Sequence, residues 1–326
     1  MKLQRRKFLQ LAGAATVAPA FSRVATAQSY PSRPITMIVS VAAGSSGDVV
    51  ARVLAERMKG ALGQPIIIEN VSGGDGNIGV GRLARARPDG YTIDLGTQSP
   101  HGLNAVFYSL PYDVLTDFEP ISPLVPIPYV LFARKSMRAK NLNELIAWLK
   151  ANPDKASTAV TGASQRLVAM LFQKETGTRF ALVPYRGGSQ AMQDLVAGQI
   201  DMFFYVPDQL RLARGAAIKA YAVTSDTRRT AAPDVPTFAE MGLPAVSYST
   251  WYGFFAPKGT PKDIIAKLNA AAVEALADPA VQSRLADLGL EIFPREQQTP
   301  EALGALVKAD AERLWPLIKE FGIKAE

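Results

Sequence analysis

The chain has 326 residues, of which 48% are hydrophobic and 20% are charged, and its formal net charge is +7. It contains no cysteine, which excludes the small extracellular domains that depend on disulfides, whereas a chain of this length can bury a core without them. At this length we expect two domains.

The first 27 residues have the organisation of an export signal. A basic start precedes an apolar run at 9–21, and a small-x-small end stops at Ala27. The Arg5-Arg6 pair predicts the twin-arginine type, which exports folded chains. A membrane anchor is the alternative, but the apolar run is shorter than the roughly 20 residues that a bilayer crossing needs. We predict cleavage after Ala27 and a periplasmic location.

Cleavage would change the electrostatic balance of the chain. The segment removes five positive charges and no acid, which lowers the formal charge from +7 to +2. Most of the basic character therefore belongs to the signal, and we expect neither a nucleic acid nor an anionic membrane surface as a partner. The five charges are Lys2, Arg5, Arg6, Lys7 and Arg23.

Apolar β-branched runs alternate with helical periodicity along the mature chain. The run at 35–41 precedes 48–63, where Val50, Leu54 and Met58 recur on one helix face. This rhythm is typical of an open parallel sheet in an α/β protein. Pro-rich 120–128 is expected to be an interdomain crossing. Further strands are predicted at 65–70, 91–97, 129–134, 157–162, 181–185, 199–205, 218–224 and 251–257, and further helices at 142–153, 164–177, 189–198, 261–278, 279–289 and 300–322.

The spacing Gly74-x-Gly76-x-x-Gly79 follows the strand predicted at 65–70, as in a dinucleotide-binding fingerprint. Asp89 or Asp94 could supply the acid that such a fingerprint requires further along the chain. However, two residues separate the strand from the glycines, and Asp94 lies within a predicted strand. We therefore interpret the glycines as allowing a loop to approach a cleft and start a helix.

Three predicted strand-to-helix turns combine small residues, a hydroxyl and free backbone amides. Each places a helix N-terminus at the carboxyl end of a strand, where the amides and the helix dipole favour a bound anion. The alternative is that Ser46, Ser164 and Ser189 are only N-caps. Because the turns lie on both sides of the predicted crossing, we favour one shared anion site. The turns are 43–47, 161–164 and 186–189.

The sequence offers little for catalysis. It has no thiol, a single imidazole at His101 and no Gly-x-Ser-x-Gly elbow. A metal site of the ordinary His/Cys type is equally unsupported. His101 could act as an acid or base, but we favour a cleft-lining or structural histidine. We predict no catalytic residue, no metal and no cofactor.

Seven segments, in order, resemble the Bug family, the solute receptors of tripartite tricarboxylate transport systems. The resemblance implies a type II periplasmic-binding-protein fold, in which two α/β domains joined by a two-segment hinge close on a small carboxylate. It also implies no enzyme activity and delivery of the ligand to a membrane permease. The segments are 30–58, 62–79, 86–97, 110–122, 182–202, 221–242 and 251–261.

On this resemblance we expect 31–126 and 253–326 to form one domain and 127–252 the other, with crossings near Pro126 and Trp251. The ligand carboxylate would be held by the first turn and by a Gly/Ser turn of the second domain. Asp48 could instead be a first-turn helix acid favoured by the dipole. The implied ligand-binding residues are Ala43, Gly44, Ser45, Ser46 and Asp48, then Thr161, Gly162 and Ser164, with Tyr185, Arg186 and Gly187 as a further wall.

Departures from the family pattern concern the choice of ligand. Ser40-Val41 and Gly44-Ser45 replace the usual residues of the first turn, Tyr205 replaces an acid, and Arg166 replaces a histidine. The pocket thereby loses an acid and gains a cation and an aromatic wall, so an anionic ligand with an apolar or aromatic body is favoured. Alternatively, Tyr205 packs in the domain core with its hydroxyl satisfied.

The sequence thus predicts a monomeric, non-catalytic receptor for a small organic carboxylate, which could be an aromatic acid or a dicarboxylate. Two rivals remain. One is a ligand-dependent sensor partner of a signalling system, and the other is an enzyme that acts on a carboxylate.

Overall fold

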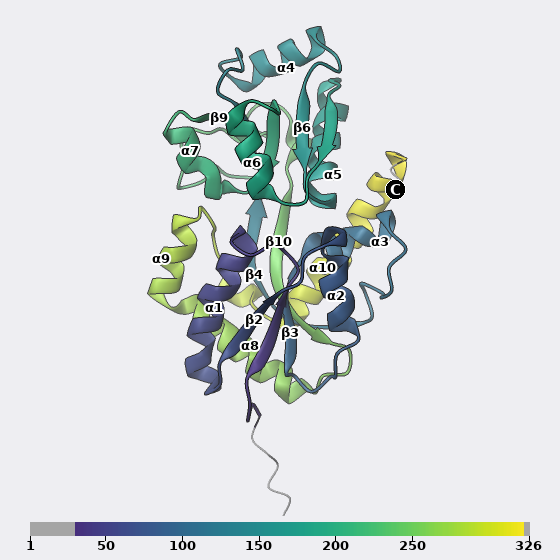
Figure 1. Ribbon diagram of the computed structural model, residues 1–326, viewed down its shortest axis with the longest axis vertical. Helices are drawn as coiled ribbons and strands as arrows, with labels where there is room; N and C mark the ends of the chain where they lie inside the picture. Colours follow the sequence, from purple (N-terminus) through teal and green to yellow (C-terminus); the bar gives the residue numbers. More distant parts are fainter. Residues whose placement is uncertain (1–29, 323–326) are drawn as a thin grey trace, which may run out of the picture.

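The computed structural model describes residues 30–322, so the predicted export signal and its cleavage site lie outside the described residues. Two five-stranded sheets form the two lobes of an elongated molecule (Figure 1). The sheet order is β2-β1-β3-β10-β4 in the first lobe and β7-β6-β8-β5-β9 in the second. The expected architecture of two α/β units is therefore present.

The first lobe contains both ends of the described chain. Strand β1 pairs in parallel with β2 and β3, whereas β10 runs antiparallel between β3 and β4. Its strands are β1 (Ile35–Val39), β2 (Ile66–Asn70), β3 (Thr92–Thr97), β4 (Phe118–Pro128) and β10 (Ser249–Pro257), and its helices are α1 (Ser46–Leu62), α2 (Asn77–Ala84), α3 (Asn104–Phe107), α8 (Lys262–Ala277), α9 (Pro279–Asp287) and α10 (Pro300–Glu320).

The second lobe is built from the middle of the chain. Strand β6 pairs in parallel with β7 and β8, whereas β5 runs antiparallel to both β8 and β9. Its strands are β5 (Val130–Arg134), β6 (Ser157–Val160), β7 (Ala181–Pro184), β8 (Met202–Tyr205) and β9 (Ile218–Val223), and its helices are α4 (Leu142–Ala151), α5 (Ala163–Thr176), α6 (Gly188–Ala197) and α7 (Leu210–Arg214).

Both sheets are mixed, which corrects the prediction of an open parallel sheet. The reason lies in the crossings between the lobes. The chain runs from the end of β4 at Pro128 almost directly into β5, and it returns through β10. A strand that enters a sheet from the other lobe arrives from the opposite end, so β5 and β10 lie antiparallel to their neighbours.

The Pro-rich crossing segment is part of β4 and pairs with the returning strand. Pro126 lies opposite Trp251 in the β4–β10 register, which has irregularities at Tyr252/Gly253 and Phe254/Phe255. Strand β4 is at the edge of its sheet, where proline is tolerated because one side of the strand has no ladder partner. The two predicted crossings thus lie side by side, while the exact domain boundaries stay a prediction.

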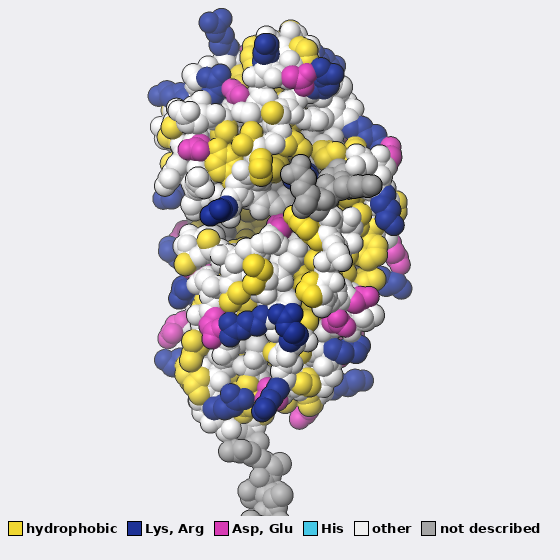
Figure 2. Space-filling model, turned by 45° about the vertical axis from the view of Figure 1, so that its right-hand side comes forward, with side chains coloured by type: hydrophobic (Ala, Val, Ile, Leu, Met, Phe, Trp, Pro, Cys, Tyr) yellow, Lys and Arg dark blue, Asp and Glu magenta, His cyan; other side chains and the backbone are white. Residues whose placement is uncertain are grey.

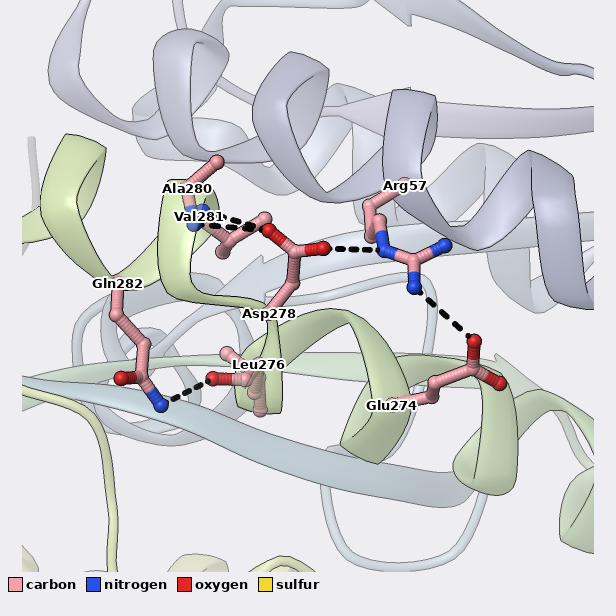
Figure 3. A network of polar contacts seen from close by, with 7 residues as sticks. All are labelled: Arg57, Glu274, Leu276, Asp278, Ala280, Val281 and Gln282. Carbon is pink, nitrogen blue, oxygen red and sulfur yellow. Dashed lines mark hydrogen bonds and ion pairs between the residues drawn. The ribbon is translucent and has the colours of Figure 1, made fainter.

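A polar network joins α1 to α8 and α9 (Figure 3). The Arg57 Nε donates to Asp278 Oδ2 at 2.7 Å, and its Nη2 lies 3.3 Å from Glu274 Oε1. Asp278 also caps α9 by accepting from the backbone of Val281 and Ala280, and these bonds together with Arg57 hold the pKa of its carboxyl below the usual range. Helix α1 is therefore fixed within the first lobe.

The surface carries both signs of charge. On the face drawn in Figure 2, Lys and Arg side chains are interspersed with Asp and Glu. None of the helices within residues 30–322 combines the length and the apolar character that a bilayer crossing requires.

Candidate functional site

A cavity of about 1090 Å³ lies between the two lobes. The first lobe contributes the turn that precedes α1 and the loop at 72–76, and the second contributes the starts of α5 and α6. The crossing strand β10 contributes Thr250 and Tyr252. The cavity is large enough for a small organic ligand and is bordered by both lobes.

Three helices begin at this cavity, as the three turns predicted. Their N-cap residues are Ser45, Gly162 and Gly187, and Ser45 makes no side-chain capping bond with the described part of the chain. Ser46, Ser164 and Ser189 follow these caps inside the helices. The alternative that these three serines are only N-caps is therefore wrong.

The turn before α1 carries unused hydroxyl groups. Ser40 and Ser46 line the cavity and are 3% and 6% exposed, yet within residues 30–322 their hydroxyls have no hydrogen-bond partner. The Ser45 hydroxyl is equally unpartnered there. Leaving a buried hydroxyl unpaired costs on the order of 1–3 kcal/mol, so these groups mark a place where a ligand acceptor would be stabilised.

Gly44 in this turn and Asp48 in the first turn of α1 do not line the cavity in the structure described for residues 30–322. The Asp48 carboxylate accepts from the Gly44 amide at 2.9 Å, from Arg52 Nε at 3.0 Å and from Asn70 Nδ2 at 2.9 Å. Burial favours the neutral acid, but these hydrogen bonds outweigh it and hold the pKa of Asp48 below its ordinary value. Asp48 therefore braces the turn instead of contacting the cavity.

The start of α5 lines the cavity through Thr161, Gly162 and Ser164, but the Ser164 hydroxyl is already hydrogen-bonded. The Ser164 hydroxyl lies 3.1 Å from the Ser99 hydroxyl and donates to Gln98 Oε1 at 3.3 Å. Both partners belong to the segment after β3 in the first lobe. The hydroxyl that was predicted to hold a ligand therefore joins the two lobes.

This junction continues into the first lobe. Gln98 Oε1 also accepts from the Tyr248 hydroxyl, and Gln98 Nε2 donates to Asp310 Oδ2 at 2.5 Å. Asp310 lies on α10 and also accepts from Trp251 Nε1 at 2.7 Å. The start of α5 is thus connected to the crossing strand and to α10.

Asp75 is a cavity residue that the sequence analysis missed. Its carboxylate Oδ2 accepts from the amide of Ala163, at the start of α5 in the other lobe, at 2.9 Å. A Cβ atom on Gly162 would lie 2.4 Å from Asp75 Oδ1, so a larger residue there would displace the Asp75 carboxylate. Burial raises the pKa of Asp75 to about 7. The available signal was an acid in a glycine-rich loop that was expected to approach the cleft.

The glycines around Asp75 have local roles. Gly76 has a φ of 87°, and a Cβ on Gly79 would lie 2.8 Å from the Val71 carbonyl oxygen. The loop at 72–76 lines the cavity and α2 begins at Asn77. The interpretation that the glycines bring a loop to a cleft and start a helix is confirmed.

The wall at α6 combines backbone and aromatic groups. Tyr185, Arg186 and Gly187 line the cavity, and the Tyr185 hydroxyl donates to Asp194 Oδ2 at 2.7 Å. Tyr205 also lines it but is only 8% exposed, because its ring stacks on Phe203 with centroids 4.6 Å apart. Tyr205 is therefore both a packed core ring and part of the wall, and Arg166 adds a cation to the cavity.

His101 lies in the core of the first lobe. It is fully buried, its Nε2 is 2.8 Å from Asp94 Oδ2, and its ring stacks on Phe255 at 4.1 Å. It does not line the cavity as described over residues 30–322. The structure thus supports a structural histidine. Within the same residues, no cluster of three or more His, Cys, Asp or Glu side chains could hold a metal ion.

Comparison with known proteins places this cavity in context. The family model described as the tripartite tricarboxylate transporter family receptor matches residues 50–323. The chain belongs to this family. A protein encoded in the TAR-I ttuE-ttuC′ intergenic region of Agrobacterium vitis is 38% identical over 97% of this chain and 92% of its own length. BugT of Bordetella pertussis is 36% identical over 92% of each chain.

Solved structures show the same architecture. The periplasmic binding protein BugD has a TM-score of 0.85 at 37% identity, over 91% of this chain and 100% of its own. MatC of Rhodopseudomonas palustris, solved with bound malate, has a TM-score of 0.82 at 36% identity, over 88% and 98% of the two chains. The predicted Bug-family membership and the periplasmic-binding-protein fold are therefore confirmed, and the chain is a solute-binding receptor of this family.

Proposed function

We propose that this receptor binds a small organic carboxylate between its lobes and delivers it to a tripartite tricarboxylate transporter permease. The observation that carries the proposal is a pair of buried hydroxyls, Ser40 after β1 and Ser46 at the start of α1, which line a cavity that both lobes border and have no hydrogen-bond partner in the described residues 30–322. Hydroxyls and helix amides donate to carboxylate oxygens, and the α1 dipole favours the negative charge. The bound malate of MatC supports this ligand class.

Binding would couple to closure of the lobes. The proposed domains are 31–126 with 253–326 and 127–252, and the hinge would lie where Pro126 pairs with Trp251. A ligand that touches both lobes favours the closed arrangement by its differential affinity for the two states. In this proposal the protein acts as a monomer, needs no cofactor and leaves its ligand chemically unchanged.

The receptor would bind its ligand in the periplasm and would therefore have to be exported. We place it in the periplasm after cleavage behind Ala27, with the Arg5-Arg6 pair as the export address. Replacing this pair with Lys-Lys is expected to leave uncleaved precursor in the cytoplasm. A normal yield of mature periplasmic protein from that variant would refute the twin-arginine assignment.

A thermal-shift screen of the mature chain tests the ligand class. Mono-, di- and aromatic carboxylates would be compared with neutral amides of the same shape, since a ligand at 100 times its Kd stabilises by roughly 2.7 kcal/mol. We expect shifts with carboxylates only. Equal shifts with the amides, or none with any acid, would refute the proposal, and consumption of a bound acid would indicate an enzyme.

A further inference from the structure

The protein places one of its own carboxylates at an anion-binding position in the cavity. Asp75 Oδ2 lies 2.9 Å from the Ala163 amide, in the first turn of α5. Asp75 holds this position from a backbone with φ 53° and ψ 36°, a conformation that residues other than glycine adopt at a cost. The loop is fixed from the first lobe, because Asn104 Nδ2 donates to the Asp75 carbonyl oxygen at 3.0 Å.

The two helix starts therefore differ in what they offer a ligand. At α1, the hydroxyls of Ser40 and Ser46 are buried and unpartnered within residues 30–322. At α5, Asp75 accepts from Ala163 and the Ser164 hydroxyl is bonded to the first lobe. A ligand carboxylate is expected to lie at α1, and a second one directed at α5 would meet the Asp75 carboxylate.

The charge around Asp75 comes from few groups. Among residues 30–322, the charged and titratable side chains that interact electrostatically with Asp75 are Arg166 on α5, Tyr108 and Tyr112 beyond α3, and Tyr129 at the crossing. Burial raises the pKa of each tyrosine, so all three are neutral near pH 7. Burial has the largest effect on the pKa of Asp75 and raises it, whereas the hydrogen bonds from Ala163 and Asn104 and the charge of Arg166 lower it only in part. A second carboxylate placed here would therefore meet one cation and one acid.

We propose that Asp75 is a specificity-determining residue that fills the α5 anion position and so selects ligands with a single carboxylate over matched dicarboxylates. This inference rests on the proposed function, because it assumes that a carboxylate binds in the cavity. The preferred ligand has one carboxylate for the α1 start and an uncharged or cationic group towards Asp75. Like charges at close range inside a low-dielectric cavity repel strongly, which is the physical basis of the selection.

Two substitutions of Asp75 test the selection. Asp75→Asn keeps the shape, tolerates the positive φ and removes the charge, whereas Asp75→Gly opens the position. The probes are succinate with butyrate and adipate with hexanoate, each pair differing by a carboxylate in place of a methyl group. We expect wild type to favour the monocarboxylates, and both variants to shift the Kd ratio at least tenfold towards the dicarboxylates.

The matched control is Glu274→Gln, which removes one negative charge from the α1–α8 network outside the cavity and should leave the ratio unchanged. Unchanged ratios in both Asp75 variants, with carboxylates still bound, would overturn the inference and leave the proposed function standing. If none of the four acids binds to wild type or variants, the matched pairs are built on the acids that bind in the carboxylate screen. If no acid of that screen binds, the proposed function fails as well.

The wild-type protein offers a second measurement that requires no Asp75 variant to fold. Lowering the pH from 8 to 6 protonates Asp75 and should shift the ratio towards the dicarboxylates. If Asp75→Asn folds, its Kd ratio at the same two pH values shows how much of the shift comes from protonation of the ligand acids. The same ratio measured with Glu274→Gln must shift as wild type does, because this acid lies outside the cavity. A pH-independent wild-type ratio would overturn the inference.

Discussion

The start of α1 and the start of α5 have nearly the same composition but different contacts. Both combine small residues with serine, and both begin a helix at the cavity. At α1, the serine hydroxyls are unpartnered within residues 30–322, and the bracing acid Asp48 comes from the same helix. At α5, the partners Asp75, Ser99 and Gln98 all come from the other lobe. Similar sequences thus provide a binding position in one place and an interlobe junction in the other.

The difference has a consequence for closure. The contacts at α1 exist within one lobe and would persist if the lobes moved apart. The contacts at α5 join the lobes and would be lost. Opening would return the Asp75 carboxylate to water, so the free energy of the proposed closure would include the transfer of that group out of water.

The largest expected effect is a pH dependence of closure. The pKa of Asp75 is about 7 in the structure and would approach the ordinary value of 3.8 in an open form. Between these values the closed form binds more protons, so lowering the pH favours closure, by up to about 1.4 kcal/mol per pH unit. The ligand-free protein should therefore have a smaller radius of gyration by X-ray scattering at pH 5 than at pH 8.

The control for this prediction is Asp75→Asn, which is neutral throughout. Burial also raises the pKa of Asp208 to about 6, so the decisive quantity is the difference between wild type and variant. Equal pH profiles for the two proteins would show that Asp75 does not report on closure.

Removing a hydroxyl at α1 should have the next largest effect, and it should fall on binding. Ser46→Ala deletes a donor that has no partner in the free protein within residues 30–322, so the melting temperature should hardly change. Loss of a hydrogen bond to a charged ligand group costs roughly 1.5–3 kcal/mol, or more than tenfold in affinity. Calorimetric titration of the best ligand from the carboxylate screen measures it.

The counterpart at α5 is Ser164→Ala. Because the Ser164 hydroxyl is bonded to Gln98 and Ser99, this variant should lose about 1 kcal/mol of stability with a smaller change in affinity. The contrast between the two serines would disappear if both variants lost affinity equally, as expected if both hydroxyls belonged to one shared anion site.

The sequence predicted most of the elements and the helix starts but not their contacts, and it missed the short helices α3 and α7 and the strand character of β4. Periodicity located α1 and α5, since each shows one apolar face over several turns. It could not show that β5 and β10 enter from the opposite lobe, because strand direction depends on the path of the chain. Asp75 was missed for a similar reason, since its partner Ala163 lies 88 residues further along the chain.

The smallest expected effect concerns Tyr205 in the wall at α6. A variant there shows how much this wall contributes to ligand choice relative to the starts of α1 and α5. Its ring stacks on Phe203, and a Cβ atom on Gly188 would lie 2.1 Å from its hydroxyl oxygen, so the ring is fixed by packing. Tyr205→Phe keeps that ring, and we expect a stability change within about 0.5 kcal/mol.

Because Tyr205 lines the cavity, loss of its hydroxyl should weaken the binding of malate relative to that of succinate by at most about 1 kcal/mol. The reason is that malate carries a hydroxyl group that could pair with Tyr205, whereas succinate does not. Paired titrations of the two acids against wild type and variant measure this difference. Tyr205→Asp provides the opposite test, because a buried acid against Phe203 should lower the melting temperature as well as the affinity for every acid. If Tyr205→Phe alone lowers the melting temperature by several degrees while the malate-to-succinate ratio is unchanged, the hydroxyl supports the fold and takes no part in ligand choice.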